Sequence, residues 1–117
     1  MGHLPRDRRI TTRREIGSLL AAARVRGRDL DLHWHTASGP LPRATCITPK
    51  YGHSVVERNK LRRRLRELLR RVLLCRSAHV DYLVRIRPSA YERSFAELEN
   101  QLRALEGRLP AAPDDEA

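Results

Sequence analysis

The stretch SVVERNKLRRRLRELLRRVLL, residues 54–74, decides how the rest of the chain can fold. Ser54 and Glu57 form a capping box, the pattern that marks the start of a helix. Leucine or valine at positions 61, 65, 68, 69 and 72 then falls on one arc of roughly 100° around that helix. Eight of the fourteen residues from 58 to 71 are basic, and they cover the remaining surface. The stretch therefore predicts a helix with one apolar stripe and one strongly positive face.

The positive face is the first indication of function. Arg58, Arg62 and Arg66 repeat at i, i+4 spacing, where like charges on a helix repel by about 0.2–0.5 kcal/mol per pair. A helix face that contacts only water normally carries charges of both signs. A polyanion that binds and neutralises this face is therefore the better explanation of its arginines. Guanidinium groups bind phosphate bidentately and stack on bases, which favours structured RNA as the partner.

The residues before this helix predict one helix and at least two strands. Thr12 and Glu15 form another capping box, apolar residues at 16, 19, 20 and 23 share one face, and Gly27 is expected to end that helix. Residues 30–35 alternate between apolar and polar, which predicts a half-buried strand. Residues 43–48 predict a second strand, bounded by the turn at 39–42 and by Pro49.

After the basic helix, the chain predicts one more strand and one more helix. Residues 80–87 alternate, and Ser89 with Glu92 predicts the start of a helix that ends at Gly107. The basic helix then joins two strands as a crossover connection. We expect an α+β fold, a two-layer α/β sandwich with helices on a small mixed sheet, in the order αβββαβα with the basic crossover helix between the last two strands. This domain would span residues 10–109, between a flexible basic arm (1–9) and a disordered acidic tail (110–117).

Length and composition limit the class of protein. The chain has 117 residues and a net charge of +10, which predicts one small domain with a polyanionic partner, most often nucleic acid. The longest apolar run, residues 19–23, is far shorter than the roughly 20 residues of a membrane helix. Cys46 and Cys75 are too few for a disulfide scaffold. We expect a soluble, cytoplasmic protein without membrane association.

The sequence GHSVVERNKLRRRLRE, residues 52–67, resembles the signature helix of the bacterial ribonuclease P protein subunit. The core of that signature is an Arg-Asn-Arg/Lys triplet followed by a basic helix, and the triplet here is Arg58-Asn59-Lys60. The resemblance extends over about residues 4–108 and includes the basic arm, the Arg26-Gly27-Arg28 step into the first strand and the order of elements.

The resemblance implies that the chain is the protein subunit of a ribonucleoprotein endoribonuclease that removes the 5′ leader of precursor tRNA. Its partners would be the catalytic ribonuclease P RNA and precursor tRNA, with no obligate protein partner. The residues that correspond to RNA contacts are Lys50, Arg58, Asn59, Lys60, Arg62, Arg63, Arg66 and Arg70. The residues that correspond to a leader-binding cleft between the first helix and the sheet are Ile16, Leu20, Leu32, His33 and Trp34. The alternation of Trp34 with Leu30 and Leu32 favours a core position for Trp34 over a contact, and both interpretations stay open.

No side chain is assigned to catalysis, which is expected from the RNA subunit. A metal-dependent nuclease needs converging carboxylates, and the acidic residues here are scattered along the chain. His33, His35, Asp29 and Asp31 alternate on one predicted strand, but no CxxC or HExxH spacing supports a metal site. The resemblance implies Mg²⁺ in the ribonucleoprotein, held mainly by RNA, with none tightly bound to the protein alone.

Two other classes share the size and charge of this chain. A small ribosomal-type RNA-binding module with no role in cleavage would not require the triplet in a crossover helix. A DNA-binding regulator would place the basic helix in the major groove, but it would be expected to use a helix-turn-helix, whereas strands flank the helix here. Stimulation of a catalytic RNA tests the first alternative, and preference for structured RNA over duplex DNA tests the second.

Overall fold

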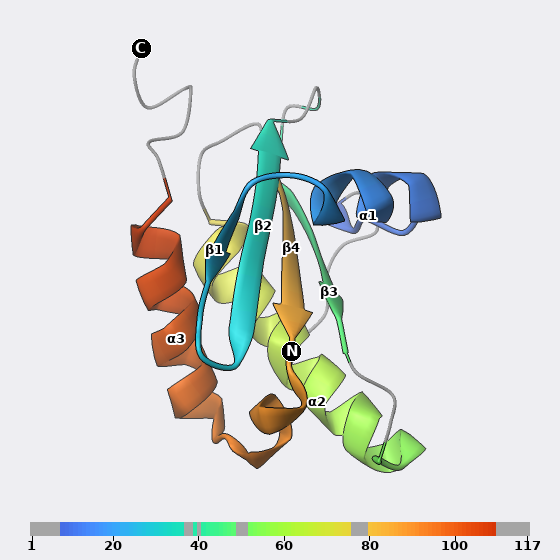
Figure 1. Ribbon diagram of the computed structural model, residues 1–117, viewed down its shortest axis with the longest axis vertical. Coiled ribbons are helices and arrows are strands. Elements are labelled where there is room, and N and C mark those ends of the chain that lie inside the picture. Colours follow the sequence, from blue (N-terminus) through green and yellow to red (C-terminus); the bar gives the residue numbers. More distant parts are fainter. Residues whose placement is uncertain (1–7, 37–38, 40, 49–51, 76–79, 110–117) are drawn as a thin grey trace.

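The computed structural model describes residues 8–36, 39, 41–48, 52–75 and 80–109 (Figure 1). The predicted order αβββαβα is confirmed, with the basic helix between the last two strands. The elements are α1 (Arg13–Leu20), β1 (Arg24–Arg26), β2 (Leu30–Thr36), β3 (Arg43–Ile47), α2 (Val55–Leu68), the π-helical turn η2 (Leu69–Leu73), β4 (Val80–Ile86), the 3₁₀ helix η3 (Pro88–Glu92) and α3 (Phe95–Gly107).

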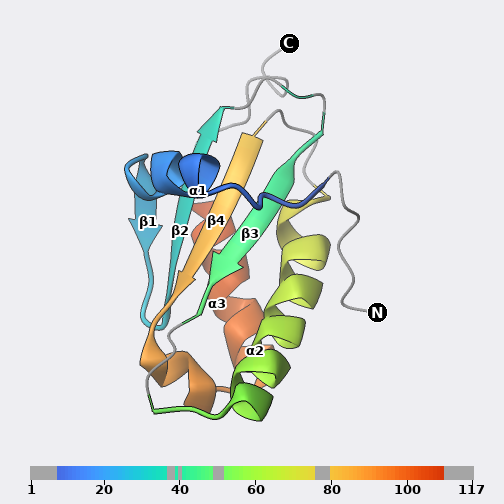
Figure 2. The same ribbon diagram turned by 90° about the vertical axis from the view of Figure 1, so that its right-hand side faces the viewer.

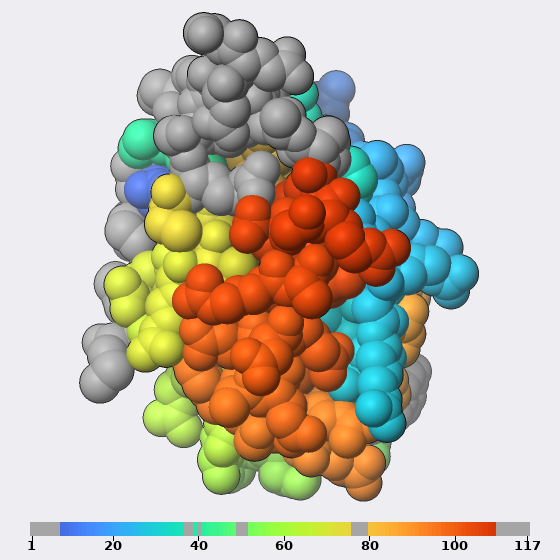
Figure 3. All heavy atoms as spheres, turned by 90° about the vertical axis from the view of Figure 1, so that its left-hand side faces the viewer, coloured from blue at the N-terminus to red at the C-terminus, as the bar shows by residue number. Residues whose placement is uncertain are grey.

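The four strands form one mixed sheet in the order β1-β2-β4-β3. β1 pairs with β2 and β2 with β4 in antiparallel fashion, whereas β3 and β4 are parallel. Parallel neighbours need a crossover, and α2 provides it. α2 and α3 cover one face of the sheet and α1 lies on the other (Figures 1 and 2). Figure 3 shows α3 lying between α2 and the β1–β2 hairpin.

The core is divided by the sheet. The larger cluster joins one face of β2 and β4 to the apolar stripes of α2 and α3, and it includes Leu32, Tyr82 and Leu65. The smaller cluster, on the face that carries α1, contains Ile10, Leu19 and Leu83. β4 is therefore buried on both faces for most of its length. This explains why Leu83 is apolar, although Asp81 and Arg85 on the same face of the strand are charged.

The first helix is shorter than its pattern predicted. α1 ends at Leu20, and Arg24–Arg26 instead form β1, in which Val25 is buried opposite Leu32. Gly27 lies in the turn that joins β1 to β2, where its N–H donates to the Leu30 carbonyl at 2.8 Å. The prediction that the helix continues to Gly27 was wrong because sheet pairing and burial of Val25 outweigh local helix propensity.

The start of the third helix was also mispredicted. Ser89 lies in η3, and the capping box of α3 is formed by Ser94 and Glu97, five residues further on. Ser89 instead donates to Oδ1 of Asp29, which is 0% exposed and also accepts from Arg93 and Gln101. Burial alone would raise the pKa of Asp29, but these hydrogen bonds outweigh burial and hold it below its usual value.

The expected N-terminal arm and acidic tail fall mostly outside the described residues, at 1–7 and 110–117. The last two residues of the expected arm contact the folded body. Arg8 donates to the carbonyls of Pro42 (2.6 Å) and Leu74 (2.8 Å), and Arg9 bridges to Ala44 of β3. The boundary at residue 9 stays a prediction, and these contacts show that Arg8 and Arg9 themselves lie against the folded body.

We predict opposite effects on stability from two glycine-to-alanine substitutions. A Cβ at Gly27 would lie 2.5 Å from the Leu30 carbonyl oxygen and against Leu105, so Gly27→Ala should lower the free energy of unfolding by about 1–3 kcal/mol. Gly17 lies inside α1, and a Cβ added there would meet no atom within 4 Å, so Gly17→Ala should raise it by about 0.5–1 kcal/mol. Urea unfolding measures both, and a shift of the two variants in the same direction would contradict this packing.

Candidate nucleic-acid interface

α2 presents its basic residues because its ends and its apolar stripe are fixed. The predicted capping box is present: Ser54 Oγ accepts from the Glu57 N–H at 3.1 Å, and Glu57 accepts from the Ser54 N–H at 2.9 Å. Leu61, Leu65 and Leu68 are buried against the sheet. The opposite side of the helix, which carries the arginines, therefore faces solvent.

The basic residues of α2 and η2 divide into two groups. The first group has no ion pair with any described residue, and it comprises Arg58, Lys60, Arg62, Arg63, Arg64 and Arg66. The second group is neutralised, since Arg70 lies 2.5 Å from Glu67 and Arg71 lies 2.9 Å from the same carboxylate. Asn59 is exposed beside the first group, and Lys50 lies outside the described residues. Unneutralised charge is thus concentrated at positions 58–66.

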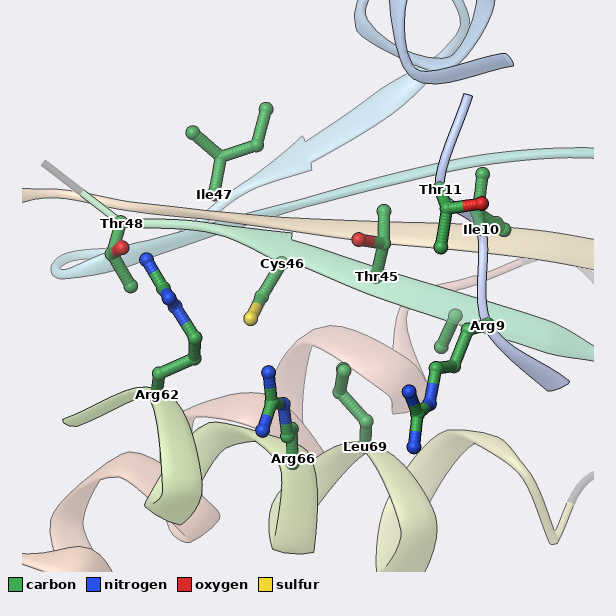
Figure 4. A pocket seen from close by; sticks show the side chains of 11 residues that line it. Arg9, Ile10, Thr11, Thr45, Cys46, Ile47, Thr48, Arg62, Arg66 and Leu69 are labelled. Atoms are coloured by element: carbon green, nitrogen blue, oxygen red, sulfur yellow. The ribbon is translucent and has the colours of Figure 1, made fainter. Parts of the chain in front are cut away.

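Arg62 and Arg66 reach from α2 toward β3 and border a groove of about 390 Å³ (Figure 4). Its other walls come from β3 and Thr48 after it, from the segment before α1 and from η2. The lining residues there are Arg9, Ile10, Thr11, Ala44, Thr45, Cys46, Ile47, Thr48 and Leu69. The Cys46 side chain points into the groove (Figure 4). Burial raises the pKa of this thiol to about 11, against the opposing effect of Arg66 and Arg62. The described residues that line the groove supply cationic, hydroxyl and apolar groups and no carboxylate, which suits an anionic ligand.

A second basic hollow, of about 400 Å³, lies on the sheet face that carries α1. The register places Arg26, Asp31 and Arg85 opposite one another on β1, β2 and β4. Arg87 binds the Asp31 carboxylate at 2.8 and 3.0 Å, so this carboxylate already has a cationic partner. Arg24 also lines the hollow, and Ile47 lines both this hollow and the groove beside α2. The sequence pattern did not reveal this cluster because it depends on strand register.

The residues expected to bind a leader lie in different places. On α1, Ile16 is half-buried against the smaller core cluster and Leu20 is 39% exposed. Leu32 and His33 are 0% and 1% exposed, so their side chains offer little surface to a ligand in this structure, and their role as leader contacts stays a prediction. Both faces of β2 are covered at these two residues. Burial lowers the pKa of His33 most, and the positive charge of Arg24 lowers it further. Trp34 is half-buried against the main core, on the sheet face that α2 and α3 cover.

Most of the described acidic side chains pair with arginines or cap helices, and these described side chains form no metal-binding cluster. Asp81 binds Arg43 at 2.8 Å, and Glu15 binds the same guanidinium, which lowers the pKa of Glu15. No three His, Cys, Asp or Glu side chains are arranged to hold a metal ion anywhere in the part of the chain that the structure describes. These residues therefore do not fit a bound Mg²⁺. None of the described helices is long and apolar enough to cross a membrane.

These features define a class of protein. A small α+β sandwich that exposes unneutralised arginines on a crossover helix, two of which also line a neighbouring groove, is typical of proteins that bind RNA through its phosphates.

Comparison with known proteins identifies the family. The sequence profile described as "Ribonuclease P" matches residues 4–110. The chain is 35% identical over 91 residues to the ribonuclease P protein component of Xylella fastidiosa (strain 9a5c), covering 75% of this chain and 67% of that protein. It is 44% identical over 81 residues to the corresponding protein of Thermus scotoductus, covering 68% and 47%. The chain belongs to the ribonuclease P protein family, the protein component of the endoribonuclease that matures the 5′ end of tRNA.

Solved structures agree on the fold. The ribonuclease P protein of Thermotoga maritima has a TM-score of 0.73 at 19% identity, covering 88% of this chain and 98% of that one. A mutant Staphylococcus aureus ribonuclease P protein has a TM-score of 0.75 at 19% identity, covering 85% of each. The matched region spans only about half of the Thermus protein. The family assignment confirms the predicted resemblance and displaces the ribosomal-type and DNA-binding alternatives.

We predict that the salt dependence of RNA binding separates unneutralised from neutralised arginines. Each phosphate contact contributes about one to the slope of log affinity against log salt, so Arg62→Gln should reduce the slope by about one. Arg103 on α3 binds Glu99 at 2.8 Å, and Arg103→Gln, the same change in charge, should leave the slope unchanged. Filter-binding titrations with ribonuclease P RNA measure both slopes, and equal losses would contradict an interface centred on α2.

Proposed function

We propose that this chain binds ribonuclease P RNA through the outer face of α2 and guides the 5′ leader of precursor tRNA along the groove between α2 and β3. The observation that carries the proposal is the position of Arg62 and Arg66. Both belong to the unneutralised group of α2 and both line the groove. One helix can thus contact the catalytic RNA on its outer side and the substrate strand on its inner side.

The outer face of α2 has the character of a surface for structured RNA. Asn59 and Arg63 are exposed there, and a hollow of about 430 Å³ is lined by Val56, Asn59, Arg62, Arg63 and Arg66. Arg58 and Lys60 extend the charge toward the start of the helix, and Lys50 is proposed to extend it further. Arg70 is proposed to contribute less, because Glu67 already neutralises it.

The leader is proposed to pass from this groove onto the open sheet face. Ile47 borders both the groove and the second hollow, so the two form neighbouring parts of one basic path around β3. Arg9 and Arg66 would bind phosphates at one end of the path, and Arg24 and Arg85 at the other. Ile16 and Leu20 of α1 offer aliphatic contacts beside it, which stack on bases less well than aromatic rings do.

The protein's own contribution is placement and charge. Neutralising phosphates lets two polyanions approach, and holding the leader fixes the position of the scissile bond. Because the described acidic side chains do not fit Mg²⁺, we propose that the metal ions of the complex are held by RNA. We further propose that the complex acts in the cytoplasm, on precursor tRNA, without an obligate protein partner.

A cleavage assay tests this function. Labelled precursor tRNA is mixed with a bacterial ribonuclease P RNA at low Mg²⁺, with and without the protein, and the protein alone is the control. We expect cleavage at the mature 5′ end only when RNA and protein are both present, and we expect Arg66→Gln to reduce this stimulation. Binding to the RNA without any stimulation would overturn the proposed function and favour a binding module with no role in cleavage.

The path of the leader has a separate test, because Cys46 reports from inside the groove. In a Cys75→Ser background, Cys46 is the only thiol, and its rate of modification by a methanethiosulfonate reagent can be followed in the complex. Precursor tRNA should slow this reaction several-fold, whereas mature tRNA, which lacks a leader, should not. Equal rates with the two tRNAs would place the leader elsewhere. The converse variant, Cys46→Ser, measures the background reaction of Cys75.

A further inference from the structure

The start of α2 has little apolar anchorage. Val55 and Val56 are 60% and 75% exposed, and the first buried side chain of the helix is Leu61. The capping box at Ser54 satisfies N–H groups at this end of the helix, but it does not anchor the end to the sheet, and poorly packed helix ends fray. This part of the helix carries Arg58-Asn59-Lys60, the triplet that we propose to bind RNA. A tertiary contact other than the apolar stripe would therefore help to hold the triplet in place.

His53 makes such a contact. Its ring stacks on the ring of Tyr91, with centroids 3.5 Å apart and an interplanar angle of 8°. His53 directly precedes Ser54, the N-cap of α2, and its Nδ1 lies 3.8 Å from Glu57 Oε2. Gly52 has a φ of +77°, which favours glycine, and this turn delivers the chain to the position of His53. The stack therefore fixes the residue from which the helix starts.

Tyr91 is in turn fixed to the core. It lies in η3, where it packs against the main hydrophobic cluster next to Ala90, which is 0% exposed. Arg87, the N-cap of η3, directly follows β4 and donates its N–H to the Asp29 carbonyl at 2.9 Å, which ties the start of η3 to the residue before β2. Figures 1 and 2 both place η3 beside the start of α2. A chain of contacts thus runs from the sheet through Tyr91 and His53 to the capping box of α2.

Building on the function proposed above, we propose that the His53–Tyr91 stack is a positioning device for the RNA-binding triplet. The two rings raise the affinity for RNA by holding the first turns of α2 in one orientation, and neither ring touches the RNA. Without the stack, the turn that carries Arg58 frays, and RNA binding must then bear the cost of ordering it.

Binding of ribonuclease P RNA to the full chain tests this proposal. His53→Ala and Tyr91→Leu should each weaken binding by about 2- to 10-fold, the range expected for an aromatic pair. The double variant should bind about as weakly as either single variant, because both remove the same contact. His53→Phe should restore binding, since it keeps a stacking ring and removes both ring nitrogens. His35→Ala, the same change on the half-buried end of β2, is the matched control and should bind normally.

Hydrogen exchange provides the readout of position. The amide protons of residues 58–60 should exchange faster in His53→Ala than in the parent chain, and His53→Phe should restore their protection. Amide protons of β4 should be unaffected. Urea unfolding of each variant shows how much of any loss in binding comes from global unfolding. Global unfolding would also speed the exchange of the β4 amide protons.

Each alternative outcome overturns a definite statement. If His53→Phe binds as weakly as His53→Ala, the imidazole contacts RNA and the positioning role is wrong. Additive losses in the double variant would show that the two rings act separately. If Arg62→Gln weakens binding and His53→Ala does not, the stack has no role while the proposed interface stands. If Arg62→Gln also has no effect, the proposed interface on α2 fails.

Discussion

The structure depends on the burial of one apolar stripe, that of α2 against the sheet. β3 and β4 are parallel, so the segment between them must cross one face of the sheet, and the leucines at 61, 65 and 68 hold it there. Because the apolar face of α2 is held against the sheet, the opposite, basic face of the helix must point toward solvent. The arginines of α2 repel one another, and their common orientation is imposed by hydrophobic burial on the other side of the helix.

The acidic residues reinforce this separation of charge. The carboxylates of Asp29, Asp31 and Asp81 are buried, and each is bound by an arginine from outside the basic helix. The arginines of α2 are left without a carboxylate partner among the described residues as a result, whereas Glu67 neutralises Arg70 and Arg71 of η2. The fold and the interface therefore use arginine in two ways. In one, the guanidinium satisfies a buried carboxylate, and in the other it remains available for a ligand.

Much of this arrangement is predictable from the sequence, because the signals that specify it are local. The capping box at Ser54 and the spacing of the leucines depend on neighbours within one or two turns. Local signals fail where distant contacts decide the outcome. Residues 21–26 favour helix on their own, yet Val25 pairs with β2; Ser89 fits a cap, yet it binds Asp29 from a distant turn. The burial of His33 and the cluster at Arg24, Arg26 and Arg85 depend on strand register and on the cover of α1, which no single segment encodes.

The arginines at the two edges of the sheet also bear on how the chain avoids pairing with other copies of itself. An exposed edge strand is a template for pairing with another copy, and proteins commonly block such edges with charge or with a covering segment. β1, at one edge, is three residues long and carries Arg24 and Arg26. β3, at the other edge, is bridged at Ala44 by Arg9. The two arginines of β1 and the β-bridge at Ala44 thus leave less of each sheet edge open to pairing with another copy of the chain.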